Sequence, residues 1–140
     1  MFQLHPQLQQ DCIVIGKFEL CRLLLMNDAN YPWFILVPER DHLREIYELS
    51  VAEQGQLIRE SSLLARALAT CFKADKINIA ALGNIVPQLH IHHIVRYTHD
   101  PAWPAPVWGK LPAKPYQAAE IDAVAGKLKT YLSVSLCHAL

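Results

Sequence analysis

Three of the seven histidines of this 140-residue chain lie in one short apolar run, Gln88-Leu89-His90-Ile91-His92-His93-Ile94-Val95. Apolar and imidazole side chains alternate from Leu89 to His92, which is the period of a β-strand. We therefore expect His90 and His92 on one face of a strand, roughly 6–7 Å apart, and His93 on the opposite face. Two imidazoles held on one rigid face predict a functional site.

Three other interpretations of the run stay open. A single histidine such as His93 is more often a hydrogen-bonded structural residue than a ligand. A His-x-His pair on a strand can also bind zinc, but zinc needs a third or fourth ligand. The remaining histidines and the cysteines show no ligand spacing (His5, His42, His99, His138, Cys12, Cys21, Cys71 and Cys137), so neither a metal nor a cofactor is expected. The third interpretation is a binding face without chemistry.

The elements that must position the run follow from the rest of the chain. Apolar and β-branched runs predict strands at 12–16, 18–26, 33–37, 76–82 and 88–97, with a hairpin turn at Gly16-Lys17. Asp41 predicts the start of a short helix through Leu49. Ser50-Val51-Ala52-Glu53 is a capping box that opens a long helix to about Phe72. That helix should bury the stripe Leu57, Ile58, Leu64, Ala65 and Leu68.

The C-terminal part of the chain is expected to consist of an irregular segment followed by a helix. Residues 101–115 are too rich in proline and tryptophan for regular structure, whereas residues 118–132 have the pattern of an amphipathic helix. Strands before and after helices predict an α+β domain. We expect an antiparallel sheet of about five strands, one long central helix and a C-terminal helix.

The histidine run resembles the signature of the histidine triad (HIT) superfamily of nucleotidyl hydrolases and transferases. That signature is His-φ-His-φ-His-φ-φ, where φ is apolar. We align Gln88 with the first histidine, His90 with the second and His92 with the third. In the alternative register, His90 and His92 come first and Ile94 replaces the third histidine.

The resemblance covers most of residues 20–100. Gly83-Asn84 precedes the motif where relatives carry Gly-Gln in a phosphate-facing loop, and the strand at 34–38 is similar to the apolar strand of the family. The tail at 100–109 is similar to that of a bacterial branch of HIT-like proteins. The resemblance thus implies a single HIT-like domain over residues 1–140, with glutamine in place of the first triad histidine.

The resemblance also implies a mechanism. His90 would attack the α-phosphorus of a nucleotide to form a covalent nucleotidyl-histidine. The backbone carbonyl of Gln88 would hold the other ring nitrogen of His90, and a carbonyl survives any change of side chain. His92 could donate a proton or bind a non-bridging oxygen. The alternative is a nucleotide-binding module that is catalytically weak or inactive.

Further contacts are implied for the nucleotide. Gly83, Asn84 and Ile85 would surround the phosphate, although Ile85 stands where relatives have Ser or Thr near the leaving group. Asn27 lies near the position that holds the ribose in relatives. For both asparagines, a simple turn residue is the alternative.

Three other side chains are candidates for the pocket. Trp33 occupies a position where relatives often have a histidine that meets the first triad histidine, so Trp33 and Gln88 are expected in one repacked corner. Arg96 follows the third motif position by four residues, as in some relatives. Trp103 belongs to the C-terminal segment, which in relatives approaches the site of the neighbouring subunit.

Composition limits the partners. The chain has 13 basic and 13 acidic residues, so no nucleic-acid partner is expected. The apolar stretches are too short to span a bilayer. Unpaired cysteines and the lack of a secretory signal predict a cytoplasmic protein. We expect a small nucleotide as the ligand and, from the resemblance and the general frequency of such dimers, a homodimer.

Overall fold

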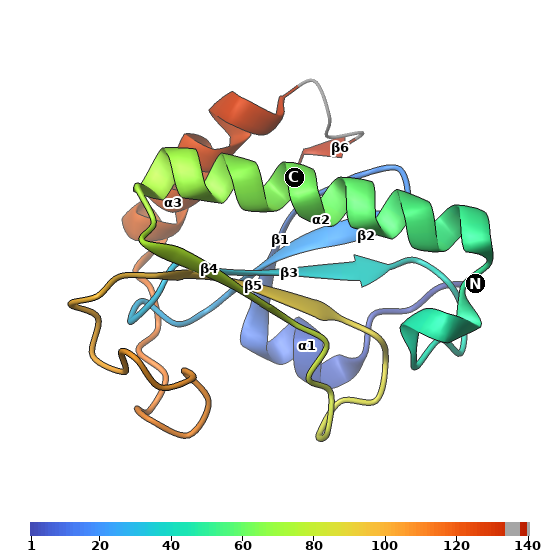
Figure 1. The fold of residues 1–140 in the computed structure, drawn as a ribbon, viewed down its shortest axis with the longest axis horizontal. Coiled ribbons are helices and arrows are strands. Elements are labelled where there is room, and N and C mark those ends of the chain that lie inside the picture. The colour runs from blue at the N-terminus through green and yellow to red at the C-terminus, as the bar shows by residue number, and fades with distance from the viewer. Residues whose placement is uncertain (134–137, 140) are drawn as a thin grey trace.

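The core of the protein is an antiparallel sheet with the strand order β4-β5-β3-β2-β1-β6 (Figure 1). The computed structural model describes residues 1–133 and 138–139. The five main strands are β1 (Cys12–Lys17), β2 (Cys21–Met26), β3 (Trp33–Pro38), β4 (Lys76–Ala80) and β5 (Ile91–Arg96); β6 (His138–Ala139) adds two residues at one edge. The predicted α+β class and the antiparallel sheet are confirmed.

Two long helices cover one face of this sheet, and one short helix with irregular segments covers the other. The helices are α1 (Pro6–Asp11), α2 (Val51–Phe72) and α3 (Ala118–Leu132), together with the 3-10 turn η1 (Ile46–Glu48). The long central α2 and the C-terminal α3 pack on the same face (Figure 1). The opposite face is covered by the N-terminal segment with α1 and by the loops that follow β4 and β5.

Alternation along the strands decides which side chain meets which layer. In β3, Phe34 and Leu36 belong to the core beneath α2, whereas Trp33 and Ile35 belong to the core on the opposite face. Every residue of β3 is buried, because the strand lies inside the sheet and both of its faces are covered.

Helix α2 begins where the sequence predicts. Ser50 caps it, and the reciprocal bonds of the capping box with Glu53 are present. Within the predicted apolar stripe, Leu57, Leu64 and Leu68 are buried, whereas Ile58 is 63% exposed. The burial of Ile58 was therefore predicted wrongly, because the inward stripe continues through small and polar side chains instead (Glu60, Ser61, Ala67 and Cys71).

Other local predictions differ from the structure. The first hairpin turns at residues 18–20 instead of Gly16-Lys17, because β1 is irregular between Val14 and Gly16 and continues to Lys17. The helix expected from Asp41 to Leu49 is only the turn η1, since His42 has φ 55° and the right-handed helix requires negative φ. Helix α1 was not predicted, although Pro at its first position is a typical start signal.

Two features concern the cysteines and membranes. Cys12, Cys21 and Cys71 are free thiols, and Cys137 lies outside the described residues. Among the described residues, no helix combines the length and the apolar character that are needed to cross a membrane.

Candidate active site

The histidine run lies at the start of β5, a strand flanked by β3 and β4. Strand β5 begins at Ile91, so His90 occupies the last position before it. The alternation predicted from the sequence is present: His92 shares a face with His90, and their ring centroids are 4.8 Å apart. His93 lies on the opposite face, beneath α2, where its ring contacts Ser61.

Within the described residues, one ring nitrogen of His90 is hydrogen-bonded and the other is not. Its Nδ1 lies 2.7 Å from the backbone carbonyl of Gln88. A carbonyl only accepts, so Nδ1 must carry the proton and Nε2 keeps its lone pair. The pKa of His90 is lowered, chiefly because the ring is buried. The hydrogen bond to Gln88 acts in the opposite direction and raises the pKa, whereas the charge of nearby His5 lowers it. A neutral imidazole with an available Nε2 is a nucleophile at neutral pH.

His92 differs because both of its ring nitrogens are engaged. The indole N–H of Trp33 donates to Nδ1 of His92 at 3.0 Å. Nε2 therefore carries the proton and donates to the carbonyl of Leu82, also at 3.0 Å. Burial lowers the pKa of His92 to about 4, and the neighbouring His90 contributes to the shift. His92 is thus a neutral donor with no free lone pair.

His93 is a structural histidine. Its Nδ1 donates to the carbonyl of Ile91 at 3.1 Å, and its Nε2 accepts from the hydroxyl of Ser61 at 2.7 Å. Burial lowers the pKa of His93 to about 4. The side chain thereby ties β5 to α2.

The loop after β4 lies against the ring of His90. A Cβ atom on Gly83 would lie 3.2 Å from Cε1 of His90 and 2.6 Å from the carbonyl oxygen of Val86, so only glycine fits at this position without displacing a neighbour. Gly83, Asn84 and His90 line a polar cavity of about 100 Å³. Ile85 does not line this cavity and is 89% exposed.

A second cavity, of about 440 Å³, lies beside His92. Its walls include Asn27, Trp33 and Trp108. The rings of Trp33 and Trp108 lie 5.7 Å and 5.0 Å from the ring of His92. Part of Asn27 is already engaged, because its Oδ1 accepts from the backbone N–H of Tyr116 at 2.8 Å. Aromatic walls next to the imidazoles can hold a planar, largely apolar group.

Gln88 is oriented differently from the expectation. Its Oε1 accepts from the backbone N–H of His5 at 2.8 Å, and its Nε2 donates to the backbone carbonyl of Gln3 at 2.9 Å. Trp33 instead bonds to His92. The expected corner shared by Trp33 and Gln88 is therefore wrong, because the N-terminal segment provides the partners of the glutamine.

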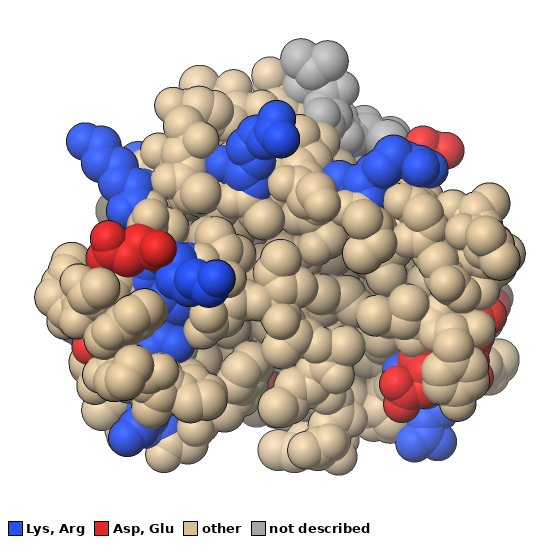
Figure 2. All heavy atoms as spheres, in the orientation of Figure 1, with Lys and Arg blue, Asp and Glu red and all other residues tan. Residues whose placement is uncertain are grey.

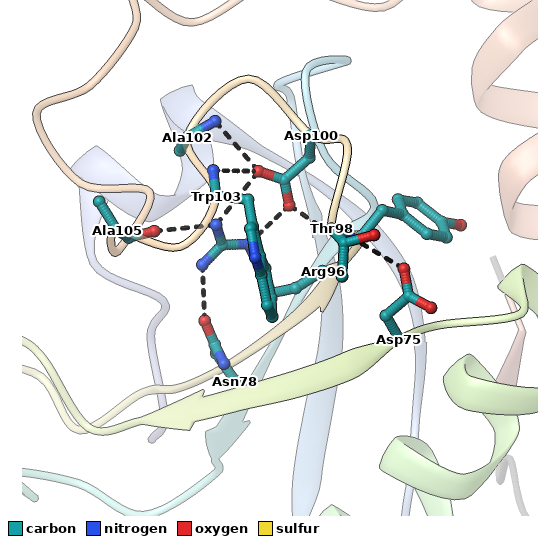
Figure 3. A network of polar contacts seen from close by, with 9 residues as sticks. Asp75, Asn78, Arg96, Thr98, Asp100, Ala102, Trp103 and Ala105 are labelled. Atoms are coloured by element: carbon teal, nitrogen blue, oxygen red, sulfur yellow. Dashed lines mark hydrogen bonds and ion pairs between the residues drawn. The ribbon is translucent and has the colours of Figure 1, made fainter.

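Arg96 supports a loop and does not line the pocket. Figure 3 shows its guanidinium group enclosed by Asp100, Asn78 and the carbonyl of Ala105, with hydrogen bonds of 2.8–3.1 Å. Arg96 is 1% exposed. Four hydrogen bonds leave it little capacity for a ligand, so its assignment to the pocket was wrong.

Trp103 belongs to the same supporting network. The guanidinium carbon of Arg96 lies 5.5 Å from the Trp103 ring centroid, and the backbone N–H of Trp103 donates to Asp100. Hydrogen bonds from Arg96 and the loop backbone hold the pKa of Asp100 at about 2 despite its burial. The cavity beside His92 is lined by Trp108 and not by Trp103, so the sequence singled out the wrong tryptophan of the loop.

Several residues around the site were not identified from the sequence. Ser61 on α2 and Leu82 after β4 supply the bonds that engage His93 and His92. His5 and Arg44 reach the surroundings of Gln88 from distant segments. One sequence signal could have located His5, because Pro6 directly after it is typical of the start of a helix. In the structure, His5 caps α1 by accepting a hydrogen bond from the backbone N–H of Gln7. Within the described part of the chain, no cluster of three or more metal-ligating side chains is present.

Comparisons with known proteins agree with this geometry. The family model described as the HIT domain matches residues 7–99. The chain is 52% identical to a histidine triad protein from Marinobacter aquaeolei VT8, with 96% of this chain and 98% of that chain covered and a TM-score of 0.94. A search of curated proteins gives no match.

Two further histidine triad proteins of known structure are similar. The protein from Bradyrhizobium japonicum is 46% identical, with 93% of this chain and 97% of that chain covered and a TM-score of 0.91. The protein from Sinorhizobium meliloti 1021 is 45% identical, with 94% and 98% covered and a TM-score of 0.93. The chain belongs to the histidine triad (HIT) domain family.

Proposed function

We propose that the protein hydrolyses or transfers nucleotides at the α-phosphate through a covalent nucleotidyl-histidine on His90. The observation that carries this proposal is the state of the His90 ring. Its Nδ1 is held by the carbonyl of Gln88, and its Nε2 forms no hydrogen bond within the described residues. Membership of the HIT family supports a nucleotide as the ligand.

The reaction proceeds in two displacements. In the first, the Nε2 lone pair of His90 forms a bond to the α-phosphorus while the bond to the leaving group breaks, and the leaving group departs with the bonding electrons. In the second, water or another acceptor attacks the phosphorus, the phosphorus–nitrogen bond breaks with its electron pair returning to Nε2 of His90, and the proton of the attacking group passes to solvent. Dividing one displacement into two lowers each barrier.

The neighbouring groups provide positions for the rest of the nucleotide. Gly83 allows the phosphate to approach the His90 ring, and Asn84 can donate an amide N–H to a phosphate oxygen. The protonated Nε2 of His92 can turn from the Leu82 carbonyl to a non-bridging oxygen. The nucleoside occupies the cavity whose walls include Trp33 and Trp108, with Asn27 near the ribose. Ile85 contributes an exposed apolar edge to the phosphate loop.

A binding module without turnover is the second candidate. It is favoured by the absence of a hydroxyl or ammonium donor among the residues that line the cavity at His90. His92 adds to this argument, because its only ring proton is already engaged. Such a pocket would hold a nucleotide but would release poor leaving groups slowly.

We also propose a homodimer that forms through β4 and α2. Strand β4 is an open edge of the sheet, and open edges readily pair with another chain. Ile79 on β4 is 51% exposed and Ile58 on α2 is 63% exposed. Figure 2 shows no charged side chain in the middle of the face on which α2 and β4 lie. Sedimentation of wild type and Ile79→Lys tests this, with the variant expected as a monomer.

The remaining properties complete the proposal. Residues 1–140 form one domain of a bacterial HIT-like branch in which Gln88 takes the place of the first histidine. The protein works in the cytoplasm without a metal, and it binds neither nucleic acid nor membrane. Gln88 serves through its backbone carbonyl, so the side-chain difference does not remove the nucleophile.

Intact-mass spectrometry after rapid mixing with a panel of nucleotides tests the enzyme proposal. The panel covers several bases with polyphosphate and phosphoramidate leaving groups. A mass increase of one nucleotidyl group is expected for wild type and not for His90→Ala. Calorimetry with nucleoside monophosphates runs beside it. Binding with neither adduct nor product supports the binding module, and the absence of any binding rejects both functions.

A further inference from the structure

The loop that follows β5 brings Trp108 to the site. The ring of Trp108 lies 5.0 Å from the ring of His92 and 5.6 Å from that of Trp33, and it lines the cavity of about 440 Å³ beside His92. In residues 98–116, all of which the structure describes, the chain forms neither a helix nor a strand. Contacts with the rest of the molecule must therefore fix this wall of the cavity.

The backbone of the loop contributes only local bonds to this arrangement. The backbone hydrogen bonds within residues 97–110 join residues three positions apart (Asp100 to Tyr97, Trp103 to Asp100, Ala105 to Ala102 and Lys110 to Val107). Such bonds shape turns, but they do not connect the loop to the sheet. Ala102 and Val107 are buried in the core on this face, yet their apolar side chains form no directional bond.

Arg96 connects the loop to the sheet. It is the last residue of β5, and strand alternation places it on the same face as His92. Its guanidinium group donates to the carboxylate of Asp100 at 2.9 and 3.1 Å, to the carbonyl of Ala105 at 2.8 Å and to Oδ1 of Asn78 on β4 at 2.8 Å (Figure 3). One side chain thus holds two positions of the loop against two neighbouring strands.

Asp100 extends this arrangement over the first part of the loop. Its carboxylate also accepts from the backbone N–H groups of Tyr97, Ala102 and Trp103, at 2.8–3.1 Å. The ring of Trp103 in turn lies 5.5 Å from the guanidinium carbon. The loop therefore has a defined position from the end of β5 to residue 105.

The burial of this ion pair indicates a role in conformation. The side chains of Arg96 and Asp100 are 2% and 4% exposed. A buried ion pair often gives no more net stability than apolar side chains of similar size, because both charges lose their hydration, but it can select one conformation. Here it selects one conformation of a proline-rich loop that lacks regular structure.

We propose that Arg96, together with Asp100, is a positioning residue for nucleoside binding. Neither side chain lines the cavity beside His92. By fixing residues 100–105, the pair fixes the nearby Trp108 and with it the wall against which the nucleoside packs. This inference rests on the proposed placement of the nucleoside in that cavity, and it specifies which residues set the affinity for the nucleoside.

The pair should control nucleoside binding and not the chemistry at His90. The hydrogen bonds that orient the two imidazoles go to Gln88, Trp33 and Leu82, and none of these residues belongs to the loop. Displacement of Trp108 therefore removes a wall of the cavity while the nucleophile keeps its orientation. A displaced loop should raise the Kd and the KM of a nucleotide and leave kcat nearly unchanged.

The test compares Arg96→Lys with Arg22→Lys. Lysine keeps the charge beside Asp100 but cannot form the forked bonds of a guanidinium group. Arg22→Lys makes the same replacement in the ion pair with Glu39, and Arg22 does not line the nucleoside cavity. Calorimetry with adenosine monophosphate should give a Kd about tenfold higher for Arg96→Lys, the effect of displacing one aromatic wall. Arg22→Lys should change this Kd less than twofold. With an adenosine phosphoramidate as substrate, Arg96→Lys should raise KM by the same factor and change kcat less than twofold.

A double-mutant cycle with Trp108→Ala tests whether the arginine acts through the tryptophan. If it does, Arg96→Lys should change Kd less than twofold once Trp108 is replaced, because residues that act through one shared contact are not additive. If Arg96→Lys does not fold, Asn78→Ala takes its place, since it removes one of the four hydrogen bonds of the guanidinium group. It should raise Kd about threefold, and this effect should also disappear in the Trp108→Ala background.

Several results would overturn the positioning role. They are an unchanged Kd in the loop variants, effects of Arg96→Lys and Trp108→Ala that multiply, a fall in kcat as large as the rise in KM, and a wild-type protein that does not bind adenosine monophosphate. The nucleotidyl adduct on wild type tests the proposed function separately. An adduct with a Kd that is independent of Arg96 supports the nucleophile and overturns the positioning role. A Kd that depends on Arg96 without any adduct supports the positioning role and overturns the covalent mechanism.

Discussion

The two faces of strand β5 carry the same residue type in opposite roles. On the face toward α2, His93 is buried with both ring nitrogens engaged, by Ser61 and by the carbonyl of Ile91. On the other face, His90, the residue directly before the strand, is also buried, but among the described residues only its Nδ1 has a hydrogen-bond partner. Burial is similar in the two cases, so the difference lies in the hydrogen-bond partners. An imidazole with both nitrogens engaged supports the fold, whereas one with a free lone pair can react.

The largest expected effect separates these roles directly. His90→Ala should reduce turnover at least about a thousandfold, because it removes the nucleophile. His93→Ala should leave a cavity and an unpaired Ser61 hydroxyl, at a cost of about 3 kcal/mol in the free energy of unfolding. Turnover and denaturant unfolding are measured for both variants. If His93→Ala lowers turnover as much as His90→Ala while it remains folded, the division of roles is wrong.

Acidification should destabilise the fold through the two fully engaged rings. The pKa values of His92 and His93 are lowered to about 4 from 6.5. Both rings are neutral in the folded and unfolded chain above pH 6.5, so they do not affect the pH dependence there. Between pH 6.5 and 4 the unfolded chain binds more protons, and stability falls by about 2 kcal/mol per ring by pH 5.

Urea unfolding between pH 4 and pH 8 measures this dependence. His93→Gln keeps a hydrogen-bonding side chain but does not titrate, and it should remove about half of the acid-induced loss. An equally steep loss in this variant would show that other groups control acid stability.

Replacement of Gly83 should disturb the position of the His90 ring more than the stability of the fold. Alanine at this position would place a methyl group 2.6 Å from the carbonyl oxygen of Val86 and 3.2 Å from the His90 ring. A displacement of the ring by even 1 Å can cost about a hundredfold in rate. The control is Gly126→Ala on α3, where an added Cβ meets nothing within 4 Å and should stabilise the helix by about 0.5–1 kcal/mol. Comparable kinetics of the two variants would contradict the close packing of Gly83 on His90.

A smaller effect is expected from the indole that engages His92. Trp33→Phe removes the donor to Nδ1 of His92 and leaves a buried acceptor unpaired, at a cost of about 1–2 kcal/mol. The ring can then change its protonated nitrogen, so turnover should fall about tenfold. Trp108→Phe keeps a ring beside His92 and removes no side-chain hydrogen bond within the described part of the chain, so it should change turnover less. Thermal unfolding and kcat/KM distinguish the two tryptophans.

The sequence predicted those features that depend on local patterns. Alternation from Leu89 to His92 placed His90 and His92 on one face, and the capping box at Ser50 identified the start of α2. The partners that decide the roles of the histidines lie far away in the chain. Trp33 is 59 residues from His92, and Ser61 is 32 residues from His93. The spacing of residues along the sequence does not predict such contacts, because they arise only when the sheet and α2 pack together.

The errors of the sequence analysis have the same origin. A tryptophan in the proline-rich loop and an arginine after the motif are both reasonable pocket residues by position. In the fold, Arg96 is surrounded by acceptors from β4 and from its own loop, and Trp103 covers it. Gln88 was correctly predicted to hold His90 by its backbone carbonyl. Its side chain, however, is hydrogen-bonded to the backbone of His5 and Gln3, which lie 83 and 85 residues earlier in the chain.

The location of the covalent adduct tests the account most directly. After rapid mixing with a nucleotide substrate and quenching, the trapped protein is digested and the nucleotidyl group is assigned to a residue by tandem mass spectrometry. Of the two histidines on this face, His90 has its proton fixed on Nδ1 and no partner for Nε2 within the described residues, whereas both nitrogens of His92 are engaged, so the adduct should be found on His90. An adduct on His92 or His5, or turnover by His90→Ala, would contradict the account.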